Sequence, residues 1–260
     1  MLTSGQNTDK RKDKIMAYRI LDISKYQPDV DYIKAAQDCD GVILRIGLTY
    51  WGAQNMGKDP YFEKHYAGFK AQGLPVGAYY YSAADSAAMA EKEADYCLSL
   101  LKGKQFELPI YYDVENSQRQ GKLTKAQLTQ IVDTFCTKVE SQGYFVGFYA
   151  STSWLKNKMD TAYLRKKYTL WKADYRLLYD RTIGCDMHQF TSEGSVDGIS
   201  GNVDLSHCYK NFPPIIRANG LNGFSKSETL KTFTAKASAG DIDRFVALAK
   251  NLEIENYTVA

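Results

Sequence analysis

The chain has 260 residues and a formal net charge of +3, with 44% hydrophobic and 24% charged residues, a composition that excludes wholesale disorder. The small positive charge is too weak to indicate a nucleic-acid partner, and no stretch approaches the roughly 20 apolar residues of a membrane span. Residues 1–15 lack the apolar segment of a signal peptide, so we expect a disordered leader there.

Eight short β-rich runs follow the leader and alternate with helical stretches. The runs cover residues 18–24, 41–47, 75–82, 108–115, 145–151, 168–175, 186–192 and 201–208. Most of them are continuously apolar instead of alternating between apolar and polar residues, as expected for strands that are covered on both faces.

Helices are predicted between the first six runs. The predicted ranges are 30–39, 60–72, 85–101, 124–142 and, as one or two short helices, 151–167. Asp59 stands before Pro60 as a cap before a first-turn proline, and Thr124 and Gln127 have capping-box spacing. Residues 176–185 and 193–200 are turn-rich and too short for a good helix, so the last three strands are expected to be joined by loops.

Alternation of strands and helices predicts a parallel sheet, and eight strands predict its closure into a barrel. The expected fold class is therefore α/β, an irregular (β/α)5(β)3 TIM-like barrel over residues 16–214. A doubly wound open sheet is the alternative, although no GxGxxG or Walker loop supports a nucleotide site on such a sheet.

The pattern changes after Pro213 and Pro214. Residues 215–223 are expected to form a linker, followed by a small α+β module at 224–260 with a strand at 227–237, an amphipathic helix at 241–252 and a final strand at 254–259. About 37 residues hold too little core to be secure alone, so we expect this module to dock on the barrel, on a copy of itself or on a missing remainder.

Five scattered cysteines form no CxxC pair, which excludes a zinc ribbon and a thioredoxin-type site. We expect reduced and mostly buried thiols. A bridge between Cys185 and Cys208 stays an alternative.

Polar residues stand at the ends of the predicted strands, where a barrel of this kind builds its active site. They are Asp22, Arg45, Tyr79, Tyr80, Tyr81, Asp113, Glu115, Tyr149, Lys172, Asp174, Gln189 and Asp204. Strands one and eight are neighbours in a closed barrel, so Asp22 and Asp204 are expected to face the same cleft.

The triplet from Asp113 to Glu115 carries the most information. Residues i and i+2 of a strand point to the same face with Cα atoms roughly 6.6 Å apart, so the two carboxyls oppose each other's ionisation. An acid beside an anion is what cleavage of a glycosidic bond requires. The simpler interpretation is a solvated acid pair at a strand end, and a metal site built from Asp22, Asp113, Glu115 and Asp204 is a further alternative.

Seven segments together resemble glycoside hydrolase family 25, the Chalaropsis-type lysozymes found among phage endolysins and bacterial autolysins. They are LDISKYQ (21–27), GVILRIG (41–47), PVGAYYYS (75–82), YYDVE (111–115), LWKADY (170–175), HQFTS (188–192) and NVDLSH (202–207). The resemblance runs from about Tyr18 to Phe212, and the order and spacing of the segments are more specific than any one of them.

The resemblance implies a peptidoglycan hydrolase that cleaves the β-1,4 bond between N-acetylmuramic acid and N-acetylglucosamine. Sugar cleavage itself needs no metal, and no cofactor is expected. The resemblance also implies that Glu115 is the proton donor, that Asp113 assists the reacting N-acetyl group or stabilises charge, and that Asp22 and Asp204 line the site. The family is generally taken as retaining, but whether a carboxylate or the N-acetyl group of the substrate attacks is left open.

Substrate-binding roles are predicted for Arg45 and Tyr149 from their strand ends, and for Tyr80, Trp171 and Gln189 from the resemblance. The triple tyrosine leaves its own register open. A non-catalytic glycan-binding barrel and a metal-dependent hydrolase are the alternative functions.

A lytic enzyme without a signal peptide is expected to accumulate in the host cytoplasm before release to the cell wall, as a phage endolysin does. A secreted or wall-bound bacterial autolysin is the alternative. The module at 224–260 is expected to bind the cell wall or to mediate self-association.

Overall fold

The structure is a computed structural model that describes residues 17–50, 52, 55–226, 240 and 242. The chain divides into two compact units, residues 1–227 and 228–260. The predicted leader at 1–15 lies outside the described residues. So do the strands and helix predicted for the module at 224–260, of which only residues 224–226, 240 and 242 are described. The first unit contains all the helices and strands named here.

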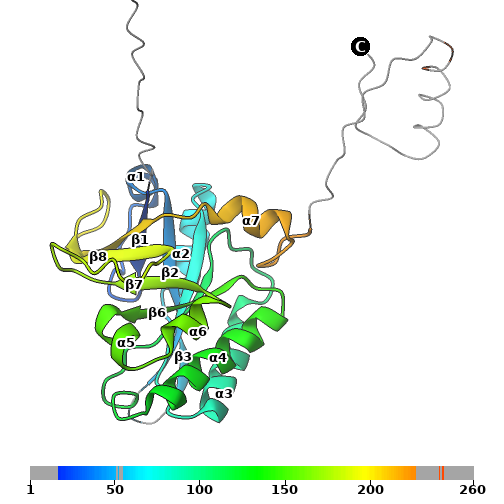
Figure 1. Ribbon diagram of the computed structural model, residues 1–260. Coiled ribbons are helices and arrows are strands. Elements are labelled where there is room, and N and C mark those ends of the chain that lie inside the picture. Colours follow the sequence, from blue (N-terminus) through cyan, green and yellow to red (C-terminus); the bar gives the residue numbers. More distant parts are fainter. Residues whose placement is uncertain (1–16, 51, 53–54, 227–239, 241, 243–260) are drawn as a thin grey trace, which may run out of the picture. The chain divides into compact units, whose positions relative to one another are not determined.

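Among the described residues, nine strands form one sheet that closes on itself. Figure 1 shows its strands with the helices around them. The strands are β1 (Tyr18–Ile23), β2 (Gly41–Thr49), β3 (Met56–Lys58), β4 (Val76–Tyr81), β5 (Ile110–Asp113), β6 (Val146–Ser151), β7 (Thr169–Ala173), β8 (Met187–Gly194) and β9 (Val203–Cys208). The order β1-β9-β8-β7-β6-β5-β4-β2 closes through a parallel β1–β2 pairing, which confirms the predicted eight-stranded barrel.

Two strands differ from the prediction. β3 is an extra strand that pairs antiparallel with the end of β2 and lies outside the barrel ring. β9 runs antiparallel to both β8 and β1, whereas the other neighbours in the ring are parallel. The β8–β9 connection is a short loop without a crossover helix, so the chain returns in the opposite direction.

Helices cover the outside of the strands, except the last helix, which packs against the inner core layer. They are α1 (Tyr32–Asp38), α2 (Phe62–Ala71), α3 (Ala87–Leu101), α4 (Lys125–Ser141), α5 (Thr152–Asn157), α6 (Thr161–Arg165) and α7 (Phe212–Ala218). The predicted capping box is present at the start of α4, and Asp160 divides the stretch 151–167 by capping α6. No helix among the described residues is long and apolar enough to cross a membrane.

The hydrophobic core has two layers. The larger layer lies between the strands and the helices and includes Leu44, Tyr112, Phe135 and Phe148. The smaller layer fills the barrel interior around Tyr111 and Trp171 and continues to Phe212 and Ile216 of α7. Successive residues of each strand therefore point alternately into the outer and the inner layer. At the carboxyl ends of the parallel strands, polar side chains replace the apolar ones of the inner layer.

The segment 215–223 is part of the barrel, which corrects the predicted linker. Pro213 and Pro214 are the second and third residues of α7. A missing N–H is harmless in this first turn, so the double proline lies at the start of a helix instead of ending the domain. Phe212 packs edge-on against Phe145, just before β6, with ring centroids 5.6 Å apart. The helix thereby closes the amino-terminal end of the barrel, opposite the predicted site.

Asn222 secures this closure. Its Nδ2 donates to the carbonyl oxygens of Phe106 (3.1 Å) and Leu108 (3.0 Å), and its Oδ1 accepts from the amide of Phe145 at 2.7 Å. The residue is fully buried at φ 55°, a backbone conformation that Asn tolerates better than other side chains.

We expect Asn222→Ala to lower the free energy of unfolding by about 2–4 kcal/mol, because three buried backbone groups lose their partners and Ala is strained at this φ. Urea denaturation checks the value. Asn219→Ala, at an exposed position of the same helix end, is the control and should change the free energy of unfolding by under about 1 kcal/mol. An equal loss in both variants would contradict a specific role for Asn222.

All five cysteines are free thiols, and four of them are buried. Cys185 and Cys208 do not form a disulfide.

Candidate active site

A cleft of about 530 Å³ opens at the carboxyl ends of the parallel strands. The four acids predicted from sequence all line it, together with side chains from β2, β4 and the segments after β1 and β2. Its walls comprise Asp22, Ile23, Ser24, Lys25, Tyr26, Gln27, Arg45, Leu48, Thr49, Tyr50, Tyr79, Tyr81, Asp113, Glu115 and Asp204. Its volume is in the range of small-ligand sites.

Asp22 and Asp204 are directly opposite residues of the antiparallel β1–β9 pair. Asp204 is the second residue of β9, not a residue at its end as the sequence suggested. Because β9 runs against the other strands, its beginning lies at the same rim as their ends. The reversed strand therefore puts Asp204 beside Asp22, which a strand running in the parallel direction would not do.

Asp113 and Glu115 both face the cleft, as their spacing predicts. Asp113 ends β5, and the ladder continues one residue further because the amide of Val114 donates to the carbonyl of Tyr149 at 3.0 Å. The side chain of Val114 is buried in the outer core, which turns its two neighbours inward. Asp113 is 5% exposed and Glu115 is exposed at the rim, so the pair combines a buried and an accessible carboxyl.

A buried amide fixes the backbone after Glu115. The side chain of Gln120 accepts from the amide of Asn116 (3.1 Å) and donates to Ser82 Oγ (2.9 Å) and to the carbonyl of Ala84 (3.2 Å). Gln120 is fully buried. The segment that carries Glu115 is therefore tied to the end of β4.

Burial and mutual repulsion raise the pKa of every acid in the cleft. For Asp113, burial is the largest cause, followed by the charges of Glu115 and Asp22, while Arg45 acts in the opposite direction. Burial and then Asp204 raise the pKa of Asp22. Glu115 is exposed at the rim, but the surrounding walls of the cleft still desolvate its carboxyl, and this desolvation and then Asp204 raise its pKa. Burial also raises the pKa of Asp204, although a hydrogen bond from Asp22 opposes this. The cluster therefore retains protons at pH values where free carboxyls have lost them.

Arg45 lines the cleft and is paired with a carboxylate behind it. Its Nε donates to Asp59 Oδ2 at 2.7 Å, and its guanidinium lies 5.4 Å from the ring centre of Tyr26. Asp59 is fully buried and does not cap α2, whose N-cap is Tyr61. The helix therefore begins at Phe62, two residues later than predicted. Asp59 Oδ1 still accepts from the amide of Tyr61 at 3.0 Å just before the helix, while Oδ2 orients Arg45.

The triple tyrosine is divided between the two faces of β4. Tyr79 and Tyr81 line the cleft. Tyr80 is fully buried on the outer face, where its hydroxyl is 3.0 Å from Thr49 Oγ1 and its ring contacts Phe135 of α4. The predicted substrate-binding role of Tyr80 is therefore wrong, because a shift of one residue moves a side chain to the opposite face of a strand.

Gln189, Tyr149 and Trp171 lie just below the cleft. Gln189 Nε2 donates to Asp22 Oδ2 at 3.0 Å, and Tyr149 donates to Gln189 Oε1 at 2.8 Å. Trp171 is 2% exposed, packs against Tyr149 and donates its indole N–H to Ser206 Oγ at 3.0 Å. These three residues support the acids from below, and the exposed aromatic surface of the cleft comes from other positions.

Three tyrosines at the site were missed as individual residues. Tyr26 and Tyr50 follow β1 and β2, line the cleft and are 71% and 48% exposed. Tyr175 follows β7 and donates to Gln189 Oε1 at 2.6 Å. Each of the three stands one to three residues beyond the end of its strand in the structure, and a tyrosine close to a strand end was their signal in the sequence.

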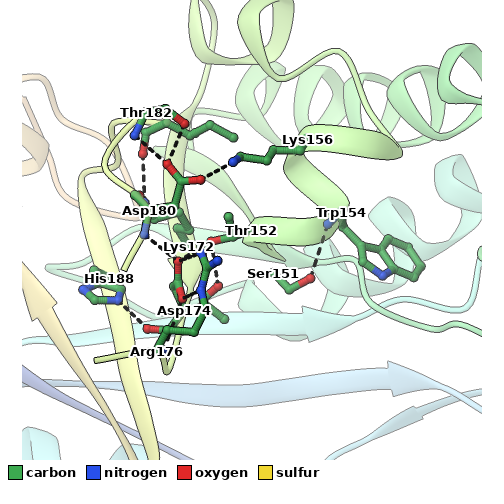
Figure 2. A network of polar contacts seen from close by, with 12 residues as sticks. Ser151, Thr152, Trp154, Lys156, Lys172, Asp174, Arg176, Asp180, Thr182 and His188 are labelled. Carbon is green, nitrogen blue, oxygen red and sulfur yellow. Dashed lines mark hydrogen bonds and ion pairs between the residues drawn. The ribbon is translucent and has the colours of Figure 1, made fainter. Parts of the chain in front are cut away.

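Lys172 and Asp174, also singled out at a strand end, point away from the cleft. Both belong to a polar network that holds the β7–β8 loop (Figure 2). Among the residues that the structure describes, no three His, Cys, Asp or Glu side chains are grouped so as to hold a metal ion.

Comparisons with known proteins agree with this geometry. The sequence profile described as Glycosyl hydrolases family 25 matches residues 21–199. An autolytic lysozyme of Clostridium acetobutylicum is 28% identical over 178 residues, which are 68% of this chain and 48% of that protein. The chain thus spans about half the length of this curated relative.

Two solved structures have similar folds. The catalytic domain of endolysin ply40 from a bacteriophage of Listeria monocytogenes is 28% identical with a TM-score of 0.64, and the match covers 77% of this chain and 97% of that one. The modular autolysin LytC of Streptococcus pneumoniae, solved with a synthetic peptidoglycan ligand, is 26% identical with a TM-score of 0.64, and the match covers 74% and 46%. The family profile matches well over half of the sequence, and the chain belongs to glycosyl hydrolases family 25.

Proposed function

We propose that this family 25 glycoside hydrolase is a muramidase that cleaves the β-1,4 bond between N-acetylmuramic acid and N-acetylglucosamine in peptidoglycan. The single observation that carries the proposal is the cleft in which Asp113 and Glu115 lie with two further acids. Hydrolysis of a glycosidic bond requires a proton for the departing oxygen and negative charge near the oxocarbenium-like sugar carbon.

Glu115 is the proton donor in this proposal. It is the acid of the DxE pair that is exposed to the cleft, so a glycosidic oxygen can reach it, and its raised pKa keeps it protonated beyond the ordinary range of Glu. After the bond breaks, the same group as a carboxylate takes a proton from the water that completes hydrolysis. The overall reaction adds one water molecule across the bond.

Asp113 assists at the sugar carbon from a more buried position, by holding the N-acetyl group of the substrate or by stabilising positive charge. Asp22 and Asp204 share a hydrogen bond and supply further negative charge beside it. The exposed rings of Tyr26 and Tyr50 offer flat apolar surfaces of the kind on which sugar rings pack.

The test is digestion of purified peptidoglycan by the full chain, followed by borohydride reduction and mass spectrometry of the fragments. Muramitol at the new reducing ends is the expected product. Glucosaminitol ends would keep the glycosidase class and overturn the bond assignment, and unchanged glycan would favour a binding protein.

We expect hydrolysis to be unchanged by a chelator, because the proposed chemistry uses only carboxyls. The release of reducing ends in the presence and absence of EDTA measures this. Loss of activity in EDTA that a divalent cation restores would favour the metal-dependent alternative, in which the four acids act as ligands.

We further propose that the chain is a phage endolysin that reaches the cell wall from inside the host. The match over nearly the whole catalytic domain of endolysin ply40 supports this origin. Controlled expression in a host of the same cell-wall type should lyse cells only when a membrane-permeabilising protein is also expressed. Lysis by the chain alone would favour an exported autolysin.

A further inference from the structure

The β7–β8 loop takes the place of a barrel helix and is held by several polar contacts. Figure 2 shows its centre, the carboxylate of Asp174 directly after β7. Asp174 accepts from Thr152 Oγ1 (3.0 Å), from the amide of Asp180 (2.9 Å) and from Nε of Arg176 (2.7 Å). These bonds, those from Arg176 foremost, hold the pKa of Asp174 far below its usual range.

The far side of the loop is held as firmly. Lys172 is fully buried and donates to the carbonyl oxygens of Asp180 (2.6 Å) and Ile183 (2.9 Å). The carboxylate of Asp180 pairs with Lys156 of α5 and accepts from the amide of Thr182 at 2.7 Å. Lys172 and Asp174 therefore hold the loop at this strand end and do not face the cleft.

Tyr175 is the loop residue that follows Asp174. Its hydroxyl donates to Gln189 Oε1 at 2.6 Å, and Tyr149 donates to the same oxygen at 2.8 Å. An amide oxygen that accepts two hydroxyl bonds leaves its NH2 group to face the other way, toward Asp22 Oδ2 at 3.0 Å.

We propose that Tyr175 is a positioning residue of the active site, which the Asp174-anchored loop holds against Gln189 so that Gln189 donates to Asp22. This inference rests on the proposed function, because it assigns a role in the same hydrolysis. Tyr175 acts through Gln189 on the Asp22–Asp204 pair.

The consequence for pH dependence follows from the groups around Asp22. Asp204 faces Asp22 from β9, Asp113 from the end of β5 and Glu115 from the segment after β5. Gln189 donates to Asp22 from β8. Burial, then Asp204 and Glu115, favour the protonated form of Asp22, and the amide of Gln189 favours the ionised form. Loosening Gln189 therefore shifts ionisation of Asp22 to higher pH.

The experiment measures kcat and KM against pH on soluble uncross-linked peptidoglycan for wild type and Tyr175→Phe. We expect kcat to fall about three- to tenfold, the effect of one hydrogen bond. KM should stay within about twofold, and the acid limb of the pH profile should move to higher pH. Tyr163→Phe, which removes an exposed hydroxyl bonded to Asp133 on the outside of the barrel, is the matched control and should leave all three quantities unchanged.

A double-mutant cycle with Gln189→Leu separates positioning from substrate contact. In the Gln189→Leu background, Tyr175→Phe should have no further effect on kcat. An additive loss, a change in KM alone or an unmoved acid limb would overturn the inference. If the wild type released no muramic reducing ends, the proposed function would be refuted. If the wild type were active and Tyr175→Phe had the same kinetics, only the role of Tyr175 would be refuted.

Discussion

Replacing Glu115 by Gln is expected to lower kcat by about 10²–10⁴-fold, the contribution of a positioned general acid. Gln keeps the size of the side chain but cannot protonate the leaving oxygen. Because Glu115 is exposed at the rim, the variant should retain the melting temperature of the wild type within about 2 °C. Release of reducing ends from peptidoglycan and a thermal melt are the two measurements.

Glu140→Gln provides the matched control, since Glu140 is exposed on α4 outside the barrel. Turnover of the Glu115 variant near that of this control would refute the assignment of the proton donor. The wild-type rate should also fall as the pH rises through the raised pKa of Glu115, because the acid form is the reactive one. This alkaline limb should be absent from the residual activity of Glu115→Gln.

Local sequence patterns predicted the barrel and the four acids of the cleft because each pattern reports a local physical constraint. Eight apolar runs separated by helices require a layered sheet, and closure joins the first and last runs. The period of two along a strand is enough to put Asp113 and Glu115 of the DxE triplet on one face. The positions of Asp22 and Glu115 in the cleft follow from these two constraints alone.

The differences arise where tertiary contacts decide. The three consecutive tyrosines fit either face of β4, and packing of Tyr80 against Phe135 selects the outer face for it. The direction of β9 depends on how the β8–β9 loop returns, which composition does not encode. The two prolines of α7 suit a helix start as well as a chain break, and only the burial of Phe212 and Ile216 distinguishes the two.

Asp113 lowers the stability of the folded protein at neutral pH. It is 5% exposed, and its Oδ1 has no hydrogen-bond partner in the described structure. Burial, then Glu115 and Asp22, raise its pKa well above 3.8. The folded chain therefore binds this proton more tightly than the unfolded chain does. Stability is then lost as the pH rises from the ordinary Asp range through the raised pKa.

Asp113→Asn is accordingly expected to stabilise the protein by about 1 kcal/mol at pH 7 while it lowers kcat by roughly 10- to 1,000-fold. Asn supplies a neutral side chain of the same shape, so the repulsion among the four acids decreases and the assisting carboxylate is lost. Urea denaturation at several pH values and the reducing-end assay measure the two effects. The gain in stability should disappear near pH 3, where Asp113 of the wild type is protonated in both the folded and the unfolded state.

Asp133→Asn is the control with the opposite sign. Its carboxylate accepts from Tyr168 (2.6 Å) and Tyr163 (2.9 Å) and pairs with Lys167 on the outside of the barrel, contacts that lower its pKa. Stability from this group is present above the ordinary Asp range and is lost as the pH falls, so the variant should be less stable at pH 7 and equally active. If Asp113→Asn also destabilised the protein at pH 7, Asp113 would be a structural residue, and the trade of stability for catalysis in this cleft would be refuted.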